Sequence, residues 1–564
     1  MKINISTRVY LAFIVLSSVL IVWPIFLTGY FFHHDDLQVM RVFEMKRCIQ
    51  DFQIPCRWVP DMGYGNGYPL FNYYSALPYY IGGLLSFIFG LVNSAKALFF
   101  IPLVLGGVTM FFLAEKLFGK EAGFLSAILY SFAPYRALDS YVRGAVAESF
   151  AISIVPLVFY FVIKIIEKPN KKDFVLGSVT LAAFLLCHNI MTVFFMPFVV
   201  LWGLLFLYLN KWKNWKAFSA LLVLGIGLAG FFLLPVFLEK SLVQTETLLR
   251  GGGDFRAHFV TVNQLFFDRI WGYGGSQFGP NDTISFQIGW PLWWFVPLAL
   301  VVLLLKFKKD IRLTLVSVFF LFIFAVSVFM THNKSAFIWE MLGFLQYAQF
   351  PWRFLSLSIF SSAILAGYVF NILNFRFRTL VIFAAASAAI FLNWNYFIPR
   401  DFYPWINDKN KLEDPLWEIQ QKAGILDYLP KTAYEPPSRA AINPEILNGL
   451  AEVSNYDVRS NKFSFKVKVL ESTTDKVDSS AYIQVPVFDF PNWTVYVNGN
   501  KMAHDNKSSW GRIGFKLMPG DYEIKGYFQD TWPRTVGNSL TVLSLLFLVL
   551  MMKNKLLRSK LTEY

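Results

Sequence analysis

Polar residues able to do acid–base chemistry gather directly after the first apolar stretch of the chain. The sequence FFHHDDLQVMRVFE places His33, His34, Asp35 and Asp36 side by side. Adjacent carboxylates raise each other's pKa, and nearby lipid adds desolvation, so one of them can act as a general base near neutral pH. The ordinary alternative is that Asp35 or Asp36 caps the helix that follows. We favour catalysis for Asp35 and Asp36, with His34 assisting; the spacing offers no telling third ligand for a metal ion.

Further polar and aromatic residues could hold a substrate near such a base, because aromatic rings stack on sugars and arginine suits bidentate contact with phosphate. The candidates are Arg57, Trp58, Asp61, Tyr64 and Tyr68 in IPCRWVPDMGYGNGYPLFNYY, Arg136, Asp139, Arg143 and Glu148 in APYRALDSYVRGAVAES, and the separate His188 and Arg353. Each has a plain structural alternative. Aromatic residues collect at membrane interfaces, a lone His at a helix end is usually an interface residue, and a long Arg side chain reaches toward lipid head groups.

The composition is that of a membrane protein with many spanning segments. Of the 564 residues, 55% are hydrophobic and 16% are charged, whereas a soluble protein carries about 25% charged residues. Apolar runs of about 20 residues, the length that crosses a bilayer, recur along the chain. The net charge of +14 comes from short Lys and Arg runs between apolar stretches. Such runs mark cytoplasmic loops and argue against nucleic-acid binding.

These elements predict a polytopic α-helical membrane domain over residues 1–395, with about twelve transmembrane helices in the whole chain and both termini in the cytoplasm. The first span covers about Val9–Thr28, and residues 30–74 form the first outside loop. The first half of that loop is predicted to be an amphipathic helix along the membrane surface. Ala122–Ala133 is a short apolar segment. Counting the membrane crossings from the basic loops leaves no full crossing for it, so it is predicted to be a re-entrant or broken helix. Cys48 and Cys56 either form a disulfide or remain two thiols.

The C-terminal part, residues 396–535, is predicted to be an extracytoplasmic domain with a β-sandwich core. KFSFKVKVL and AYIQVPV alternate with a period of two, as half-buried strands do. Asn498-Gly499 predicts a hairpin turn. Residues 536–564 then supply a final transmembrane helix and a cytoplasmic tail. No internal repeat is visible in the sequence, which weakens a transporter interpretation.

The order of several motifs resembles a known family. FFHHDDLQVMRVFE, IPCRWVPDMGYGNGYPLFNYYSALPYY, APYRALDSYVRGAVAESFA, CHNIMTV and QFPWRFL resemble the bacterial and archaeal membrane proteins labelled 6-pyruvoyl-tetrahydropterin synthase-related. That family is grouped with the GT-C superfamily of membrane glycosyltransferases. The tail from VPVFDFPNWTVYVNGNK to DYEIKGYF is similar to the C-terminal part of membrane proteins that glycosylate teichoic acids. The resemblance covers essentially the whole chain and implies a GT-C-like fold.

The resemblance also implies roles for residues. In GT-C enzymes an acidic residue in the first outside loop is the general base, and the donor is typically a sugar on a polyprenyl phosphate. Asp35 and Asp36 match this position, with His34 beside them, but the usual second His a few residues later is absent. That absence leaves the choice of base and a role for a divalent metal ion open. We assign four residues to binding of the donor phosphate: Arg136, Arg143, His188 and Arg353. We assign seven residues to contact with the substrate: Arg57, Trp58, Asp61, Tyr64, Tyr68, Asp139 and Glu148.

The sequence thus leads to a functional hypothesis. We expect a glycosyltransferase of the plasma membrane that transfers a sugar from a polyprenyl-phosphate-linked donor to a glycan, lipid or protein acceptor at the outer face. Its partners are the lipid bilayer, the donor and the acceptor. Two other hypotheses are a transporter or flippase of lipid-linked saccharides and a non-catalytic scaffold for glycan assembly.

Overall fold

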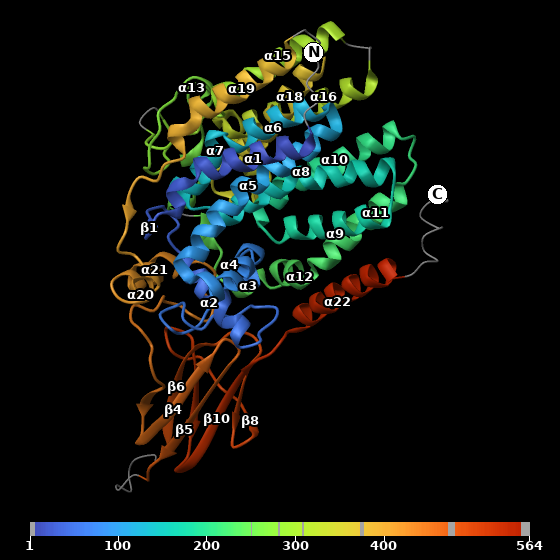
Figure 1. Ribbon diagram of the computed structural model, residues 1–564. Helices are drawn as coiled ribbons and strands as arrows, with labels where there is room; N and C mark the ends of the chain where they lie inside the picture. The colour runs from blue at the N-terminus through green and yellow to red at the C-terminus, as the bar shows by residue number, and fades with distance from the viewer. Residues whose placement is uncertain are drawn as a thin grey trace.

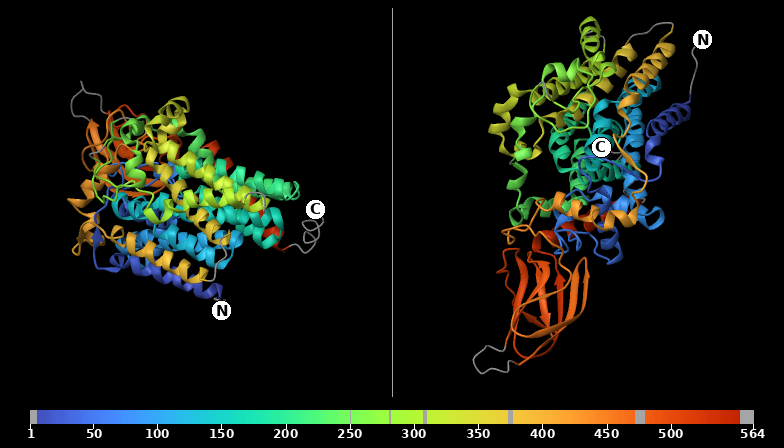
Figure 2. Two further views of the ribbon diagram at one scale, coloured as in Figure 1. Left: turned by 90° about the horizontal axis from the view of Figure 1, so that it is seen from above. Right: turned by 90° about the vertical axis from the view of Figure 1, so that its left-hand side faces the viewer.

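The computed structural model describes residues 6–249, 251–279, 282–306, 310–372, 377–471 and 480–553. The described chain is mostly helical, and its helices pack into a body from which a β domain extends at one end (Figure 1). The right-hand view of Figure 2 shows the same separation from another direction. The predicted cytoplasmic ends, residues 1–5 and 554–564, lie outside the described residues.

Several helices are long and apolar enough to cross a membrane. Seven helical segments among the described residues meet this requirement, or eight if α11 (Trp215–Leu228) and α12 (Gly230–Leu238), bent by 73°, form one broken span. The seven are α5 (Leu91–Phe118), α8 (Val146–Glu167), α10 (Asn189–Leu209), α16 (Ile311–Thr331), α18 (Leu355–Ile372, with the turn from Pro351), α19 (Arg378–Asn393, with the turn to Tyr396) and α22 (Trp532–Lys553). The expected membrane character is confirmed. The number of about twelve spans and the side of the termini stay predictions.

Shorter helices complete the helical body. The apolar ones are α1 (Thr7–Ile21), α4 (Leu77–Phe89) and α14 (Trp290–Trp293), which continues into α15 (Phe295–Lys306). The predicted first span is therefore a 15-residue helix followed by a 3-10 turn, Trp23–Phe26, because Pro24 cannot continue an α-helix. The remaining helices are α2 (Gln38–Gln50), α3 (Leu70–Tyr73), α6 (Lys120–Ser131), α7 (Pro134–Ala137), α9 (Lys171–Leu185), α13 (Val262–Phe266), α17 (Ala336–Met341), α20 (Asp408–Leu412) and α21 (Leu416–Gly424).

Two short helices differ from their description in the sequence. The segment Ala122–Ala133 forms most of α6, and every residue from Ala122 to Ser131 is buried among α1, α5, α18 and α19. Its re-entrant topology stays a prediction. Helix α2 forms where predicted, but it is enclosed by protein, and its polar face is buried at Gln38, Arg41 and Glu44. The polar face of α2 turns inward because these side chains have hydrogen-bond partners, mainly in the first loop. The position of α2 along the membrane surface stays a prediction.

The β domain contains two antiparallel sheets. One has the strand order β4-β5-β10-β7-β8 and the other the order β3-β6-β9. Their strands are β3 (Glu445–Asn448), β4 (Ala451–Arg459), β5 (Lys462–Val469), β6 (Ala481–Phe488), β7 (Trp493–Val497), β8 (Asn500–Met502), β9 (Arg512–Leu517) and β10 (Gly520–Phe528). The predicted alternation is confirmed, since the inward residues of KFSFKVKVL and AYIQVPV are all at most 3% exposed. Asn498 and Gly499, both with positive φ, form the β7–β8 hairpin turn.

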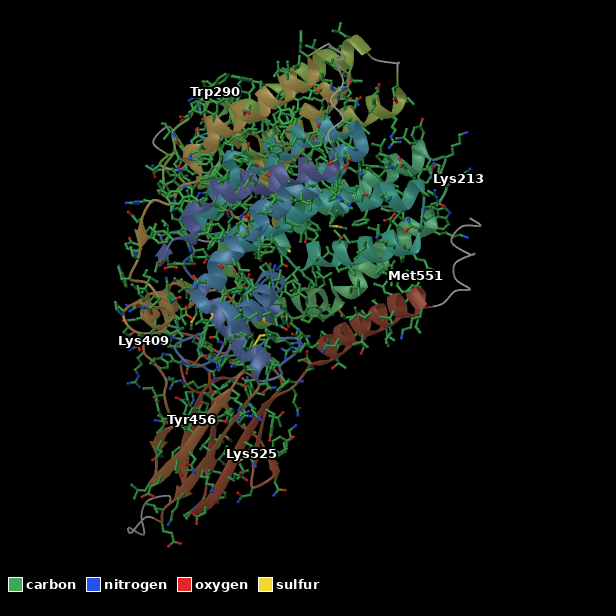
Figure 3. All side chains as sticks on the ribbon, viewed as in Figure 1. Lys213, Trp290, Lys409, Tyr456, Lys525 and Met551 are labelled. Atoms are coloured by element: carbon green, nitrogen blue, oxygen red, sulfur yellow. A yellow bond between two sulfur atoms is a disulfide. The ribbon has the colours of Figure 1, made fainter. Side chains whose placement is uncertain are left out.

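One disulfide within the first loop and one strand pairing with a distant segment hold that loop in place. Cys48 and Cys56 form a disulfide, which resolves the two alternatives (Figure 3). Strand β1 (Tyr30–Phe31) pairs with β2 (Phe402–Tyr403). The residues just before His33 are therefore held beside the segment that leads into the β domain.

Candidate functional site

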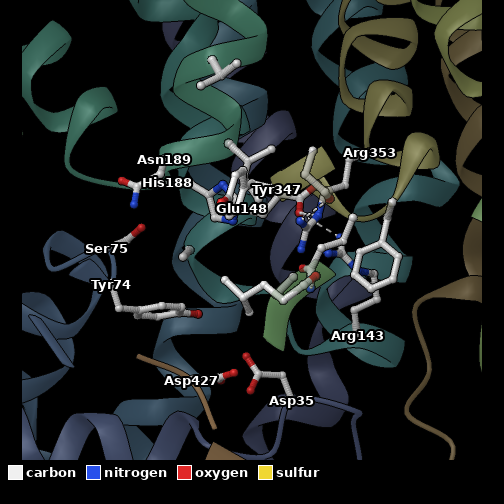
Figure 4. A pocket seen from close by; sticks show the side chains of 18 of the residues that line it. Asp35, Tyr74, Ser75, Arg143, Glu148, His188, Asn189, Tyr347, Arg353 and Asp427 are labelled. Carbon is white, nitrogen blue, oxygen red and sulfur yellow. Dashed lines mark hydrogen bonds and ion pairs between the residues drawn. The ribbon is translucent and has the colours of Figure 1, made fainter. Parts of the chain in front are cut away.

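A cavity of about 900 Å³ lies between the first loop and the loop ends of the helices. Six residues singled out in the sequence line it: His34, Asp35, Arg143, Glu148, His188 and Arg353. Figure 4 shows Asp35 on one side of this cavity and Glu148, His188 and Arg353 on the other. The structure thus brings together residues that are up to about three hundred positions apart in the chain.

Backbone hydrogen bonds join two of these distant segments. The amides of His34 and Asp35 donate to the carbonyl oxygens of Val142 and Arg143, each at 2.9 Å. The second segment is a π-helical turn, Leu138–Arg143, which ends at Gly144 with φ +71°. A Cβ atom on Gly144 would lie 2.4 Å from Nδ1 of His33. The close approach of the two segments therefore requires glycine at this position.

Asp35 and Asp36 have different surroundings. The Oδ2 atom of Asp35 accepts hydrogen bonds from Nη1 of Arg41 at 2.7 Å and from Nε2 of Gln38 at 3.1 Å. Its Oδ1 has no partner among the described residues and belongs to a side chain that is 35% exposed in the cavity. Asp36 does not line the cavity, and its Oδ2 binds Nζ of the buried Lys411 at 2.6 Å. Burial raises the pKa of Asp36, while Lys411 opposes that rise.

The histidines before these carboxylates are also arranged differently. His33 is buried, and its Nε2 lies 3.1 Å from the hydroxyl of Tyr30. Burial lowers the pKa of His33 to about 3, so its imidazole is neutral at physiological pH. His34 lines the cavity, and its Nε2 lies 2.9 Å from the carbonyl oxygen of Tyr273.

The opposite wall holds a buried cluster of charges around Glu148. The Oε2 atom of Glu148 lies 3.0 Å from Nη1 of Arg143 and 3.3 Å from Nε of Arg353. Tyr135 donates its hydroxyl hydrogen to Oε1, and Asp139 pairs with Arg143 from behind. Burial disfavours the charge of Arg143, but Glu148 and Asp139 outweigh it and raise the pKa of Arg143. Arginine is not deprotonated in proteins, so both guanidinium groups stay charged beside the cavity.

His188 occupies the N-cap of α10 at the cavity wall. Its Nδ1 accepts the backbone N–H of Met191 at 3.2 Å. Burial lowers the pKa of His188 to about 3, which keeps the imidazole neutral. Because Nδ1 is the acceptor, the single proton of the neutral ring sits on Nε2 and can be donated.

The other residues singled out in the sequence lie away from the cavity. Arg136 is buried between α5 and α8, where it donates to Ser153 at 2.9 Å and to the carbonyl oxygen of Pro102. Asp139 lies behind Arg143. Two of the others form ion pairs, Arg57 with Asp530 and Asp61 with Arg47. Two pack against rings, Trp58 on Phe490 and Tyr64 on Trp417. The hydroxyl of Tyr68 donates to the carbonyl oxygen of Gly424. A sequence cannot distinguish an aromatic ring at a ligand site from one packed between parts of a protein.

Several cavity residues had no signal in the sequence. Arg41 lies on α2 and is 3% exposed, with its guanidinium 4.3 Å from the ring centre of Tyr74. Lys240 follows α12, and its Nζ lies 3.5 Å from the ring centre of Tyr347. Asp427 follows α21 and faces Asp35 (Figure 4). Only the position of Arg41, six residues after Asp35 in a helical pattern, could have suggested its role.

The described residues also bear on a metal site. In this part of the chain no three His, Cys, Asp or Glu side chains come together as ligands. The cavity carboxylates Asp35 and Asp427 come from different segments, and His34 is engaged with Tyr273. A divalent metal ion stays a prediction of the resemblance.

The chain is similar to known proteins over different parts of its length. It is 26% identical over 372 residues to an uncharacterized protein from Lactococcus lactis subsp. cremoris, covering 62% of this chain. The chain spans about half the length of that relative, 55%. Arabinofuranosyltransferase AftD from Mycobacteria is similar over 72% of this chain and 28% of its own, with 13% identity and a TM-score of 0.47.

Two further solved structures are similar at the same level. The oligosaccharyltransferase of Archaeoglobus fulgidus is 13% identical, with a TM-score of 0.42 over 78% of this chain and 62% of its own. ArnT from Cupriavidus metallidurans is 13% identical, with a TM-score of 0.36 over 65% and 60%. A family model matches within the helical body, over the residues that include Tyr73, Arg143, Glu148 and His188. That model is the 6-pyruvoyl-tetrahydropterin synthase related domain of membrane proteins, and it matches residues 71–247.

Proposed function

We propose that this protein is a membrane glycosyltransferase that moves a sugar from a polyprenyl-phosphate donor to an acceptor at the membrane face that carries the β domain. One observation carries the proposal. A single cavity holds Oδ1 of Asp35, a carboxylate oxygen without a partner among the described residues, opposite the charged groups of Arg143 and Arg353. A base and an anion-binding wall facing one space are what glycosyl transfer from a phosphate requires.

The chemical step follows from this arrangement. Oδ1 of Asp35 takes the proton of the acceptor hydroxyl while the acceptor oxygen attacks the anomeric carbon of the sugar. The bond between that carbon and the phosphate oxygen breaks, and the electron pair leaves with the polyprenyl phosphate. Arg143, Arg353 and the Nε2 proton of His188 stabilise the growing negative charge on the phosphate. Arg41 and Gln38 hold Asp35 through its other oxygen.

The cavity also suits a lipid-linked donor. Phe237 and Phe344 line it, yet they are 76% and 57% exposed. Large exposed apolar side chains on a membrane protein face hydrocarbon rather than water. A polyprenyl chain can lie along this apolar rim while its phosphate reaches the cationic wall. Lys240 also lines the cavity and adds a further positive charge.

The proposal is tested by substituting Asp35 and Asp36 one at a time. The purified full chain in liposomes is given a panel of radiolabelled polyprenyl-phosphate hexoses and pentoses, and release of polyprenyl phosphate is measured. We expect Asp35→Asn to lower release by roughly 100-fold or more, because a positioned base contributes about that much. Asp36→Asn is the matched control, since Asp36 is bound to Lys411 outside the cavity. Full turnover by Asp35→Asn would refute the mechanism, and movement of intact donor across the bilayer without release would support a flippase.

A further inference from the structure

One carboxylate in the cavity, that of Asp427, has no role in the proposed step. Asp427 lies three residues after the end of α21, on the segment that leads into the β domain, and lines the cavity. Its side chain makes no hydrogen bond or ion pair with any residue in the described ranges, although it is only partly exposed. Burial and, to a smaller extent, the charge of Asp35 raise the pKa of Asp427 to about 6, against the opposing charge of Arg41. A carboxylate without a hydrogen bond or ion pair contributes little to the stability of the fold. Its position in a cavity therefore points to a ligand as its partner.

Asp427 and Asp35 face the same small space. Figure 4 shows the two carboxylates turned toward each other on the side of the cavity opposite Glu148 and Arg353. The free Oδ1 of Asp35 and both oxygens of Asp427 are hydrogen-bond acceptors there. The nearest cation, Arg41, is already engaged by Oδ2 of Asp35 and by the ring of Tyr74.

Aromatic rings border this acidic side of the cavity. Tyr74 lies against Arg41, and Tyr428 is stacked on Tyr73 with 5.7 Å between ring centres. All three tyrosines line the cavity. Flat apolar faces beside several hydrogen-bond acceptors match the surface of a sugar ring, which has C–H groups on its faces and hydroxyl donors around its edge.

We propose that Asp427 is a positioning residue for the acceptor, and that the acceptor is a neutral polyhydroxy group such as a sugar ring. This inference rests on the proposed function. One acceptor hydroxyl donates to Oδ1 of Asp35, the oxygen that removes its proton, and neighbouring hydroxyls donate to Asp427. An acceptor that carries a phosphate at this position is repelled by two carboxylates, while the phosphate of the donor has its own cationic wall.

The proposal separates the substrates by charge within one cavity. The anionic end of the donor meets Arg143, Arg353 and Lys240, and the neutral acceptor meets Asp35 and Asp427. The sugar to be transferred lies between these two sides. Asp427 belongs to the segment that leads into the β domain, so this segment contributes to the acceptor side of the cavity.

The experiment measures binding, so it does not require turnover. Saturation-transfer NMR is recorded on the full chain in nanodiscs with neutral methyl hexosides and pentosides, glucose 6-phosphate and a blocked serine-rich peptide. The variants are Asp427→Asn and Asp427→Ala, with Glu418→Gln on α21 as the control, because Glu418 is exposed and pairs with Lys422. Thermal unfolding of each variant is measured alongside.

We expect a neutral glycoside to bind the wild-type protein and the Glu418→Gln variant. We expect its affinity to fall by roughly tenfold in both Asp427 variants, because a hydrogen bond to a charged group is lost. Neither Asp427 variant should unfold at a lower temperature, since a buried carboxylate without a partner is removed. The proposal is overturned if no neutral glycoside binds, if Asp427→Asn binds it as well as the wild type, or if glucose 6-phosphate or the peptide binds more tightly. Failure of donor release with Asp427-dependent sugar binding would refute the glycosyltransferase step and leave the sugar site standing.

Discussion

At the scale of single residues, hydrogen bonds decide which atoms remain for chemistry. Arg41 and Gln38 occupy Oδ2 of Asp35 and leave Oδ1 to the cavity. Lys411 holds Asp36 in the same way, but outside the cavity. At His188 the backbone of Met191 occupies Nδ1 and leaves the Nε2 proton. At Asp35 and His188, a local partner thus selects the oxygen or the tautomer that faces the cavity.

The two roles of His188 can be separated by substitution. His188→Asn keeps an N-cap acceptor for the Met191 amide but loses the Nε2 proton. We expect unchanged thermal unfolding and a KM for the donor raised by roughly fivefold, the effect of one hydrogen bond worth about 1 kcal/mol.

His188→Ala is the comparison, because it should also lower stability by about 1 kcal/mol through loss of the cap. The pKa of His188 near 3 means that the ring stays neutral from pH 5 to 8. The KM ratio between wild type and His188→Asn should therefore not change over that range. A ratio that changed steeply between pH 6 and 7 would contradict the neutral donor.

At the scale of elements, the π-helical turn Leu138–Arg143 carries the site. It presents its last two carbonyl oxygens to the amides of His34 and Asp35 and directs Arg143 toward Glu148. Gly144 ends the turn in a left-handed conformation against His33. One backbone contact thus fixes the relative positions of the proposed base and of part of the proposed anion-binding wall.

Gly144→Ala tests this contact. A side chain at positive φ costs about 1–2 kcal/mol, and here its Cβ also meets His33 at 2.4 Å. We expect transfer to fall by about 100-fold, because a displacement of roughly 1 Å between catalytic groups has an effect of that size. Gly119→Ala is the matched control: its φ is +88°, and nothing lies within 4 Å of the added Cβ. Equal activity losses in the two variants, measured by polyprenyl phosphate release, would show that strain alone is responsible.

At the scale of the whole molecule, a buried polar junction joins the helical body to the β domain. Glu239, 3% exposed, accepts hydrogen bonds from Arg534 and Asn72, each at 2.9 Å. Its neighbour Lys240 lines the cavity, as does Tyr73 next to Asn72. Arg57 adds an ion pair to Asp530 at 3.4 Å. The junction is therefore continuous with the cavity wall.

Loss of the junction should destabilise the protein strongly. Arg534→Ala leaves Glu239 buried without its charge partner, which costs about 3–5 kcal/mol. Arg459→Ala is the control, because the Arg459–Asp457 pair is on the surface, with side chains 50% and 60% exposed, and such pairs contribute at most about 1 kcal/mol. Thermal unfolding of the full chain in detergent should show a clearly lower transition for Arg534→Ala alone. Similar transitions for both variants would mean that the junction does not hold the two parts together.

Several features could be read from the sequence alone. Apolar runs of spanning length determine a membrane protein, because backbone groups in lipid must bond within a helix. The period of two in KFSFKVKVL and AYIQVPV determines which side chains of β5 and β6 are buried. The turn Asn498-Gly499 is local chemistry as well. These features depend on neighbouring residues only, so composition and spacing predict them.

The assembly of the cavity was decided by the tertiary structure. The sequence singled out Asp35, Arg143, Glu148, His188 and Arg353, but it equally singled out Trp58 and Tyr64, which are buried against other side chains. It gave no sign of Asp427, whose place opposite Asp35 depends on how the segment after α21 returns to the first loop. Residue types and short spacings determined that acids, arginines and aromatic rings were present near the membrane surface. Only long-range packing decided which of them share one space, because burial and charge pairing arise between segments hundreds of residues apart.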